Sequence, residues 1–85
     1  MMKVKRILET KEVERFLKSR GLLKQYKKAK RYLLEEHFLT VCFKERRPKG
    51  SGIWYFRINK QYRAYGMFNE NDNLVVFEIN DHQNG

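Results

Sequence analysis

The side chains of this sequence best suited to chemistry are basic groups and proton-transfer groups in its second half. Arg57 and Arg63 lie on either side of a short polar segment, Lys49 lies in a basic stretch, and Asp81 is followed directly by His82. Cleavage of RNA by its own 2′-hydroxyl requires a base, an acid for the leaving oxygen, and cations for the charge that builds on the phosphate. All three kinds of group are present, so RNA cleavage is the chemistry that they could support.

These groups suit different roles in such a reaction. Planar guanidinium groups can grip a phosphate, and Lys49 can reach in from its loop as a point charge. A histidine ordinarily titrates near neutral pH, so His82 could act as acid or base. Asp81 or Glu78 could orient that histidine or act as a base.

Plainer interpretations compete with these roles. Most surface arginines are simply solvated, but like charges directly across two strands repel, which favours an anion or Glu78 between Arg57 and Arg63. A histidine near a chain end is more often frayed than catalytic, which argues against a catalytic role for His82. The resemblance described below argues for that role. For His37, near the end of a predicted helix, interaction with the helix dipole is the preferred interpretation.

A β-hairpin within residues 53–68 must position these side chains. Large apolar and polar residues alternate there, with a break at residues 59–61, which is typical of two strands joined by a tight turn. A three-residue turn sets these cross-strand pairs: Ile58 with Tyr62, Arg57 with Arg63, and Tyr55 with Tyr65. The opposite face then carries apolar residues that require cover: Trp54, Phe56, Ile58, Tyr62, Ala64 and Phe68. A two-residue turn would bury Arg63 beside Phe56, so we predict the three-residue register.

The first half of the chain predicts one strand and two helices. Residues 2–8 alternate weakly and suit an edge strand. Thr10 is a credible N-cap for a short helix that Gly21 ends, with Val13, Phe16 and Leu17 facing inward. A second helix is predicted from Leu22 to about His37, with this apolar stripe: Leu22, Tyr26, Ala29 and Leu33. Its lysines are interpreted first as a solvated face and second as an RNA or ribosome contact.

Two further strands complete the predicted sheet. Residues 39–45 alternate, which predicts a strand with Leu39, Val41 and Phe43 on one side, followed by an irregular basic loop over residues 46–52. Residues 74–80 predict the last strand, with three residues on the core face: Val75, Phe77 and Ile79. The same parity predicts these residues on the uncovered face: Glu78, Asn80, His82, Met67, Leu74 and Val76. One end of that face is therefore predicted to be apolar.

Composition narrows the class of protein. The 85 residues suit one domain over 1–85 of the α+β class, with two N-terminal helices on one face of a small, mostly antiparallel sheet. Nineteen Lys and Arg against ten Asp and Glu give a net charge of +9, which favours nucleic acid or an acidic protein as partner. Cys42 is the one cysteine and is assigned to packing, and residues 1–10 are too charged for a signal peptide. A soluble, cytoplasmic protein without membrane contact is expected.

Two segments resemble the RelE/ParE superfamily of type II toxins, most closely its HigB-like and RelE-like branches. One is Phe43 to Arg63, which contains Trp-Tyr-Phe-Arg-Ile-Asn-Lys-Gln-Tyr-Arg, and the other is Leu74 to His82, which ends in Asp-His. Residues 43–82, which hold both segments, make up about half of the chain. Two helices before an antiparallel sheet extend the resemblance over nearly all of it. The resemblance implies a RelE-like fold.

The resemblance also implies site residues. By position, Lys49 resembles a catalytic lysine of HigB-like toxins, and Arg63 resembles the phosphate-binding arginine of the superfamily. Asp81 and His82 resemble the acid and histidine of the HigB-like C-terminus, where a tyrosine often separates the two. Arg46 lies where these toxins can carry a histidine, so one candidate proton shuttle is absent. A terminal tyrosine of the RelE branch is missing as well.

Together these observations predict a ribosome-dependent messenger RNA endonuclease, independent of metal and cofactor, that inhibits translation. The predicted catalytic residues are Lys49, Arg57, Arg63, Asp81 and His82. The predicted RNA-binding residues are Lys44, Arg46, Arg47, Tyr55 and Tyr65. The two tyrosines could stack their rings on bases or donate a hydrogen bond from their hydroxyl groups. Two alternatives stay open: a ParE-like noncatalytic inhibitor of DNA gyrase, and an RNA-binding module without turnover.

The expected partners are messenger RNA on the ribosome and a cognate antitoxin protein. An acidic, partly disordered antitoxin segment would suit the positive charge and the apolar end of the uncovered face. The residues predicted to bind it are Met67, Leu74 and Val76.

Overall fold

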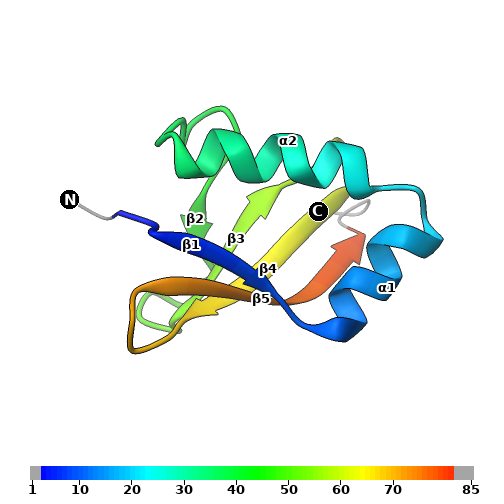
Figure 1. Cartoon of the computed structure of the whole chain (residues 1–85). Helices are drawn as coiled ribbons and strands as arrows, with labels where there is room; N and C mark the ends of the chain where they lie inside the picture. The colour runs from blue at the N-terminus through cyan, green and yellow to red at the C-terminus, as the bar shows by residue number, and fades with distance from the viewer. Residues whose placement is uncertain (1–2, 82–85) are drawn as a thin grey trace.

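The computed structural model describes residues 3–81 (Figure 1). These residues form two helices and a five-stranded sheet in the order β1 (Arg6–Glu9), α1 (Lys11–Ser19), α2 (Leu23–Leu34), β2 (Lys44–Glu45), β3 (Ile53–Arg57), β4 (Tyr62–Phe68) and β5 (Asn73–Asp81). The strands lie in the order β1-β5-β4-β3-β2. β1 runs parallel to β5, and the other neighbours are antiparallel. The predicted α+β class and the edge position of the first strand are confirmed.

Local capping sets the bounds of α1. The Val13 backbone N–H donates to Thr10 Oγ1 at 3.2 Å, which satisfies one of the free amides of the first turn. At the other end Gly21 has a φ of 66°, and the Leu22 N–H donates to the Leu17 carbonyl at 2.8 Å. This left-handed residue with a hydrogen bond reaching back over the last turn is the Schellman arrangement. The predicted N-cap and end of the helix are therefore confirmed.

The second helix is shorter than predicted. α2 ends at Leu34 rather than near His37, because Glu36 takes a φ of 66° and the His37 N–H donates to the Tyr32 carbonyl at 2.9 Å. This is again a Schellman-type end, formed here without glycine. The predicted apolar stripe is confirmed, since all of its residues are buried: Leu22, Tyr26, Ala29 and Leu33.

The predicted strand at residues 39–45 is wrong except for its last two residues. The chain forms consecutive turns there: the Cys42 N–H donates to the Leu39 carbonyl at 3.2 Å, and the Phe43 N–H donates to the Phe38 carbonyl at 2.9 Å. Cys42 has a φ of 52°, which a strand does not allow. Leu39 is 95% exposed, while Val41 is buried. Of the three residues predicted to share one side of a strand, Val41 is buried and Phe43 packs against the core, but Leu39 points into solvent, so their spacing does not mark a pleated strand.

The hairpin register is confirmed. Tyr55 pairs with Tyr65 and Arg57 with Arg63. Asn59 makes the turn, because its Oδ1 accepts the N–H groups of Gln61 and of the first residue of β4, both at 2.8 Å. The predicted inward set is buried or packed against the core: Trp54, Phe56, Ile58, Tyr62, Ala64 and Phe68.

A β-bulge between β4 and β5 overturns the predicted facing of the last strand. Tyr65 pairs with Glu78, but Gly66 pairs with Val76, so Phe77 is an extra residue in β5. Because an inserted residue shifts the alternation, side chains on its two sides follow opposite parities. Leu74 and Val76, both predicted on the uncovered face, are fully buried. Of the three residues predicted to face the core, Ile79 packs against the core cluster, but the prediction is wrong for Val75, which pairs with Met67 on the other face, and for Phe77, which is 39% exposed.

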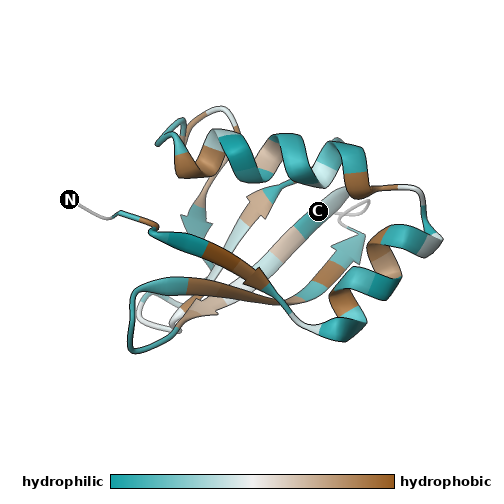
Figure 2. Cartoon of the chain, in the orientation of Figure 1, coloured by the Kyte–Doolittle hydropathy of each residue, from teal (hydrophilic) through white to brown (hydrophobic). Residues whose placement is uncertain are grey.

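One hydrophobic cluster joins the helices to the sheet. α1 contacts β5, and α2 contacts β1 and β3. Figure 2 shows apolar positions alternating with hydrophilic ones along these elements. The most deeply buried large side chains come from both helices and from the sheet: Leu17, Leu33, Phe56, Leu74 and Val76. The remaining face of the sheet is therefore free to carry polar side chains.

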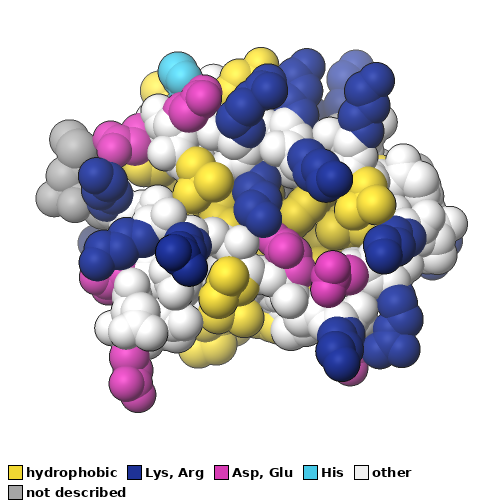
Figure 3. All heavy atoms as spheres, in the orientation of Figure 1, with side chains coloured by type: hydrophobic (Ala, Val, Ile, Leu, Met, Phe, Trp, Pro, Cys, Tyr) yellow, Lys and Arg dark blue, Asp and Glu magenta, His cyan; other side chains and the backbone are white. Residues whose placement is uncertain are grey.

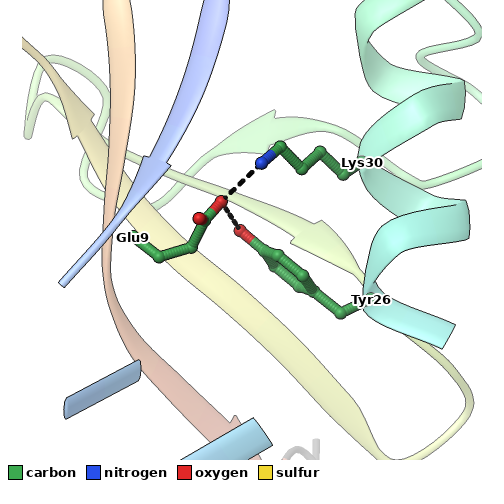
Figure 4. A network of polar contacts seen from close by, with 3 residues as sticks. All are labelled: Glu9, Tyr26 and Lys30. Carbon is green, nitrogen blue, oxygen red and sulfur yellow. Dashed lines mark hydrogen bonds and ion pairs between the residues drawn. The ribbon is translucent and has the colours of Figure 1, made fainter. Parts of the chain in front are cut away.

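A polar contact also ties α2 to β1 (Figure 4). The Tyr26 hydroxyl donates to Glu9 Oε2 at 2.7 Å, and Lys30 Nζ donates to the same oxygen at 2.9 Å. Burial raises the pKa of Tyr26 well above its ordinary value, and the Glu9 carboxylate raises that pKa further. Tyr26 should therefore stay protonated in the folded protein when tyrosines of the unfolded chain ionise.

Tyr26→Phe should change the alkaline stability in a defined direction. At pH 7 the variant should lose about 1 kcal/mol of unfolding free energy with its hydrogen bond. Above about pH 10 the unfolded wild type loses a proton that the folded state keeps, so wild-type stability should fall relative to the variant by up to about 1.4 kcal/mol per pH unit. Urea unfolding of both proteins at pH 7, 10 and 11 measures this difference. A constant difference would mean that the Tyr26 hydroxyl ionises equally in both states.

Candidate functional site

The sheet face that points away from the core is called here the open face. Strand pairing arranges its residues in three rows across the sheet. The first row holds Lys44, Tyr55, Tyr65 and Glu78; the second holds Arg57, Arg63 and Asn80; the third holds Ile53, Met67, Val75 and Leu8. The first two rows are polar and aromatic, and the third is apolar. Six of the residues predicted to form the site therefore lie in these rows: Lys44, Tyr55, Arg57, Arg63, Tyr65 and Met67.

Two arginines and two tyrosines form a stacked group on the open face, called here the Arg-Tyr cluster. The guanidinium of Arg63 lies over the Tyr55 ring, 4.7 Å from its centroid, and the Tyr55 and Tyr65 ring centroids are 5.5 Å apart. The guanidinium of Arg46 lies 5.6 Å from the centroid of the Tyr65 ring. The rings orient both guanidinium groups by cation–π contact.

Neither arginine of the cluster is neutralised within residues 3–81. The two ion pairs between described residues are Glu9 with Lys30 and Glu35 with His37, and all four residues belong to other parts of the fold. Glu78 is exposed and accepts a hydrogen bond from Asn80 Nδ2 at 3.0 Å. The cluster thus offers positive charge and aromatic rings together, which suits a ligand with phosphates and planar bases.

Arg57 is turned away from this cluster. Although it pairs with Arg63 in register, its Nε donates to the Asn59 carbonyl at 3.1 Å. The sequence predicted two arginines side by side as one phosphate grip. In the structure the two guanidinium groups have different neighbours, and Arg57 lines a hollow beside the hairpin turn together with Lys28.

The basic loop is built by its own short hydrogen bonds. Ser51 Oγ donates to the Arg46 carbonyl at 2.7 Å, and the Gly52 N–H donates to the carboxylate of Glu45 at 3.0 Å. These bonds shape the start of the loop, where the Arg46 side chain lies over the Tyr65 ring. Arg47 and Lys49 are exposed, and the structure gives their side chains no hydrogen bond or ion pair to other residues in the 3–81 range.

The predicted proton-transfer residues are only partly described. Asp81 pairs with Tyr62 at the end of β5, and its carboxylate accepts a hydrogen bond from Gln61 Nε2 at 3.1 Å. That position is beside the hairpin turn, whereas its neighbour Asn80 pairs with Arg63. His82 lies outside the described residues. The structure thus brings the cluster together and places Asp81 beside the hairpin turn instead.

The predicted antitoxin surface needs correction. Met67 is 47% exposed on the open face, but Leu74 and Val76 have no exposed surface and cannot bind a partner. The apolar row consists instead of Ile53, Met67, its partner Val75, and Leu8, which is 41% exposed. Sequence reasoning missed Leu8 and Val75. The available signal was Gly66, because glycine within a strand often marks a bulge.

The described part of the chain shows neither a metal site nor a membrane-spanning helix. No group of three or more His, Cys, Asp or Glu in residues 3–81 lies close enough to hold a metal ion. Neither of the helices described there has the length and apolar character needed to cross a membrane.

Comparison with known proteins gives no assignment. No protein-family model matches the chain, and a search of curated proteins finds no match.

Proposed function

We propose that this protein is the toxin of a type II toxin–antitoxin system, an RNA endonuclease of the RelE-like and HigB-like kind that cleaves messenger RNA on the ribosome. The observation that carries the proposal is the Arg-Tyr cluster on the open face. Its guanidinium groups and rings match the two recurrent features of single-stranded RNA, phosphate charge and unstacked bases. The net charge of +9 and the α+β architecture also support it.

In this proposal the cluster binds the scissile phosphate and the bases beside it. A base removes the proton of the 2′-hydroxyl, the 2′-oxygen attacks phosphorus, and the bond to the 5′-oxygen breaks as an acid protonates that oxygen. Arg63 would stabilise the charge that develops on the phosphate, and Tyr55 and Tyr65 would stack on bases or donate a hydroxyl. Asp81 and His82 are the candidates for proton transfer.

The apolar row beside the cluster suits the antitoxin. Leu8, Met67 and Val75 give an apolar end to a positively charged face, which an acidic segment that folds on binding could cover. Such a partner would also cover the cluster and block access of RNA. Neutralisation would then follow from occlusion of the site.

The purified protein should cleave messenger RNA in a translating extract, with cut sites that primer extension can map. Cleavage should fall when ribosomes are removed, and an acidic partner encoded beside this gene should abolish it. His82→Ala in a protein of unchanged thermal stability should lower the cleavage rate. Intact transcripts under active translation would overturn the proposal.

A second candidate is an RNA-binding module without turnover. The position of Asp81, beside the hairpin turn rather than within the cluster, favours it. Such a protein would bind RNA with strong salt dependence and leave it uncut. A gel-shift assay over a range of salt concentrations, read together with transcript integrity, separates the two candidates.

A further inference from the structure

A hollow beside the hairpin turn forms a second surface outside the Arg-Tyr cluster. It measures about 380 Å³ and lies between α2, residues 40–41 and residues 57–60. The lining residues used below are Lys28, Tyr32, Thr40, Arg57, Asn59 and Lys60. The volume falls within the range of about 300–1,000 Å³ that is usual for sites of small ligands.

At this end β3 is paired with β4 on one side but has no strand on the other side, where the hollow lies. β2 pairs only with Trp54 and Tyr55, and beyond them the Arg57 N–H donates to the Val41 carbonyl at 2.7 Å. The turns that precede β2 therefore replace a strand beside β3. Asn59, whose Oδ1 caps the hairpin turn, also donates from Nδ2 to Gln25 Oε1 on α2. This bond fixes the turn to the helix and gives the hollow a defined wall.

The charge of the hollow has one sign. Lys28, Arg57 and Lys60 line it, and none of its lining residues is acidic. The Arg57 Nε donates to the Asn59 carbonyl at 3.1 Å, which orients the guanidinium without neutralising it. Because cations gathered in a concavity without a carboxylate repel one another, the site favours an anion with several acceptor oxygens. Figure 3 shows Lys and Arg side chains gathered over α2 on the visible face.

The rest of the lining selects a ligand with an apolar, planar part. Tyr32 contributes an aromatic ring, and Ala29, Val41 and Ile58 contribute apolar surface. Thr40 and Asn59 contribute hydrogen-bonding groups at the border of this apolar wall. A phosphate joined to an aromatic base through a sugar combines the groups that such a lining complements.

We propose that this hollow binds a nucleotide, with its phosphate among Lys28, Arg57 and Lys60 and its base against the wall that includes Tyr32. The nucleotide is either a free nucleoside monophosphate or one unit of an RNA strand. The proposal does not depend on RNA cleavage, because it concerns binding at residues outside the Arg-Tyr cluster.

The test is titration of the isotope-labelled full chain followed by amide NMR. The probes are adenosine and uridine 5′-monophosphate, the two nucleosides, inorganic phosphate, and a 2′-O-methyl pentaribonucleotide that cannot be cut through a 2′-hydroxyl. The monophosphates or the pentanucleotide should shift the amides of Lys28, Tyr32, Thr40 and residues 57–60, and the nucleosides should bind more weakly. Shifts confined to the Arg-Tyr cluster, or no binding of either nucleotide probe, would overturn the proposal.

A matched pair of double variants separates the site from general charge. Lys28→Gln with Lys60→Gln should weaken binding of the nucleotide probe by about tenfold to a hundredfold. Lys24→Gln with Lys27→Gln removes the same charge from exposed positions of α2 that do not line the hollow, so its affinity should stay near wild type. Equal losses in both double variants would overturn the proposal.

The two nucleotide probes identify the source of the ligand. Monophosphates that bind as tightly as the pentanucleotide indicate a free nucleotide. Tighter binding of the pentanucleotide, with shifts in both the hollow and the cluster, indicates an RNA strand that crosses both. Either result supports the site. Failure of messenger RNA cleavage would leave these shifts unchanged, so the proposed function and this site fail separately.

Discussion

In the proposed reaction, Arg63→Ala should lower the rate of messenger RNA cleavage by about 100-fold to 1,000-fold, the range seen when one pre-organised group that stabilises developing charge is removed. Arg63 is held over the Tyr55 ring and has no ion-pair partner within residues 3–81. Its guanidinium is therefore oriented before RNA binds, and the full effect should fall on the charged transition state. Primer extension of transcripts sampled during translation measures the rate.

Arg20→Ala is the matched control for this loss. The Arg20 guanidinium also lies over an aromatic ring, that of Phe16, at 4.8 Å from the centroid, but it belongs to the end of α1. Removing it deletes the same charge and the same kind of contact away from the open face, so cleavage should stay near the wild-type rate. If both variants lost activity equally, Arg63 would act only through net charge.

Arg63→Lys separates charge from geometry. Lysine keeps the positive charge but lacks the planar fork that binds two phosphate oxygens at once. Its cleavage rate should therefore lie between those of the wild type and Arg63→Ala. Full activity in Arg63→Lys would mean that a point charge is enough at this position.

Gly66→Ala should destabilise the fold by about 1–3 kcal/mol, the usual cost of overpacking a closely packed site. A Cβ at this position would stand 2.7 Å from the Val75 carbonyl oxygen and 3.1 Å from the Val75 carbonyl carbon. Both are backbone atoms of the neighbouring strand, so neither can move without shifting β5. The midpoint of thermal unfolding should fall by about 4–8 °C for each kcal/mol lost.

The sign of the change in stability caused by Gly66→Ala tests the close contact most directly. Strand propensity alone favours alanine over glycine by about 0.5–1 kcal/mol, so a strand without the close contact would gain stability. Denaturant unfolding of wild type and Gly66→Ala gives the sign directly. A variant as stable as wild type would mean that β4 and β5 do not approach as the bulge requires.

The amino-acid sequence by itself determined the features whose signals lie close together in the chain. Asn59 caps the hairpin turn with its own side chain, and the resulting register sets Tyr55 against Tyr65. Thr10 and Gly21 bound the first helix through hydrogen bonds to near neighbours. Because these groups find their partners locally, residue types and spacing were enough to predict the α+β class, the aromatic core face and the outward position of Arg63.

Packing between distant segments decided the rest of the candidate site. Alternation in residues 39–45 predicted a strand. Instead, the Arg57 N–H at the end of β3 donates to the Val41 carbonyl, which belongs to a turn. The basic hollow lies where these segments meet. Arg57 follows the predicted register, yet the hairpin turn accepts its Nε–H. The hydrogen-bond partners of Arg57 could not be predicted from a pattern along the chain, because they depend on which segments pack beside β3.

Only the tertiary structure decided which residues of β5 face the core. The prediction assumed that side chains alternate strictly between the two faces of the strand, which an inserted residue breaks. Phe77 is inserted in β5, where Gly66 lies close to the Val75 carbonyl. Leu74 and Val76 are consequently buried, and Val75 joins Met67 on the open face. The sequence predicted that these residues form a strand, but which of their side chains face the core depended on how closely the backbones of β4 and β5 approach each other.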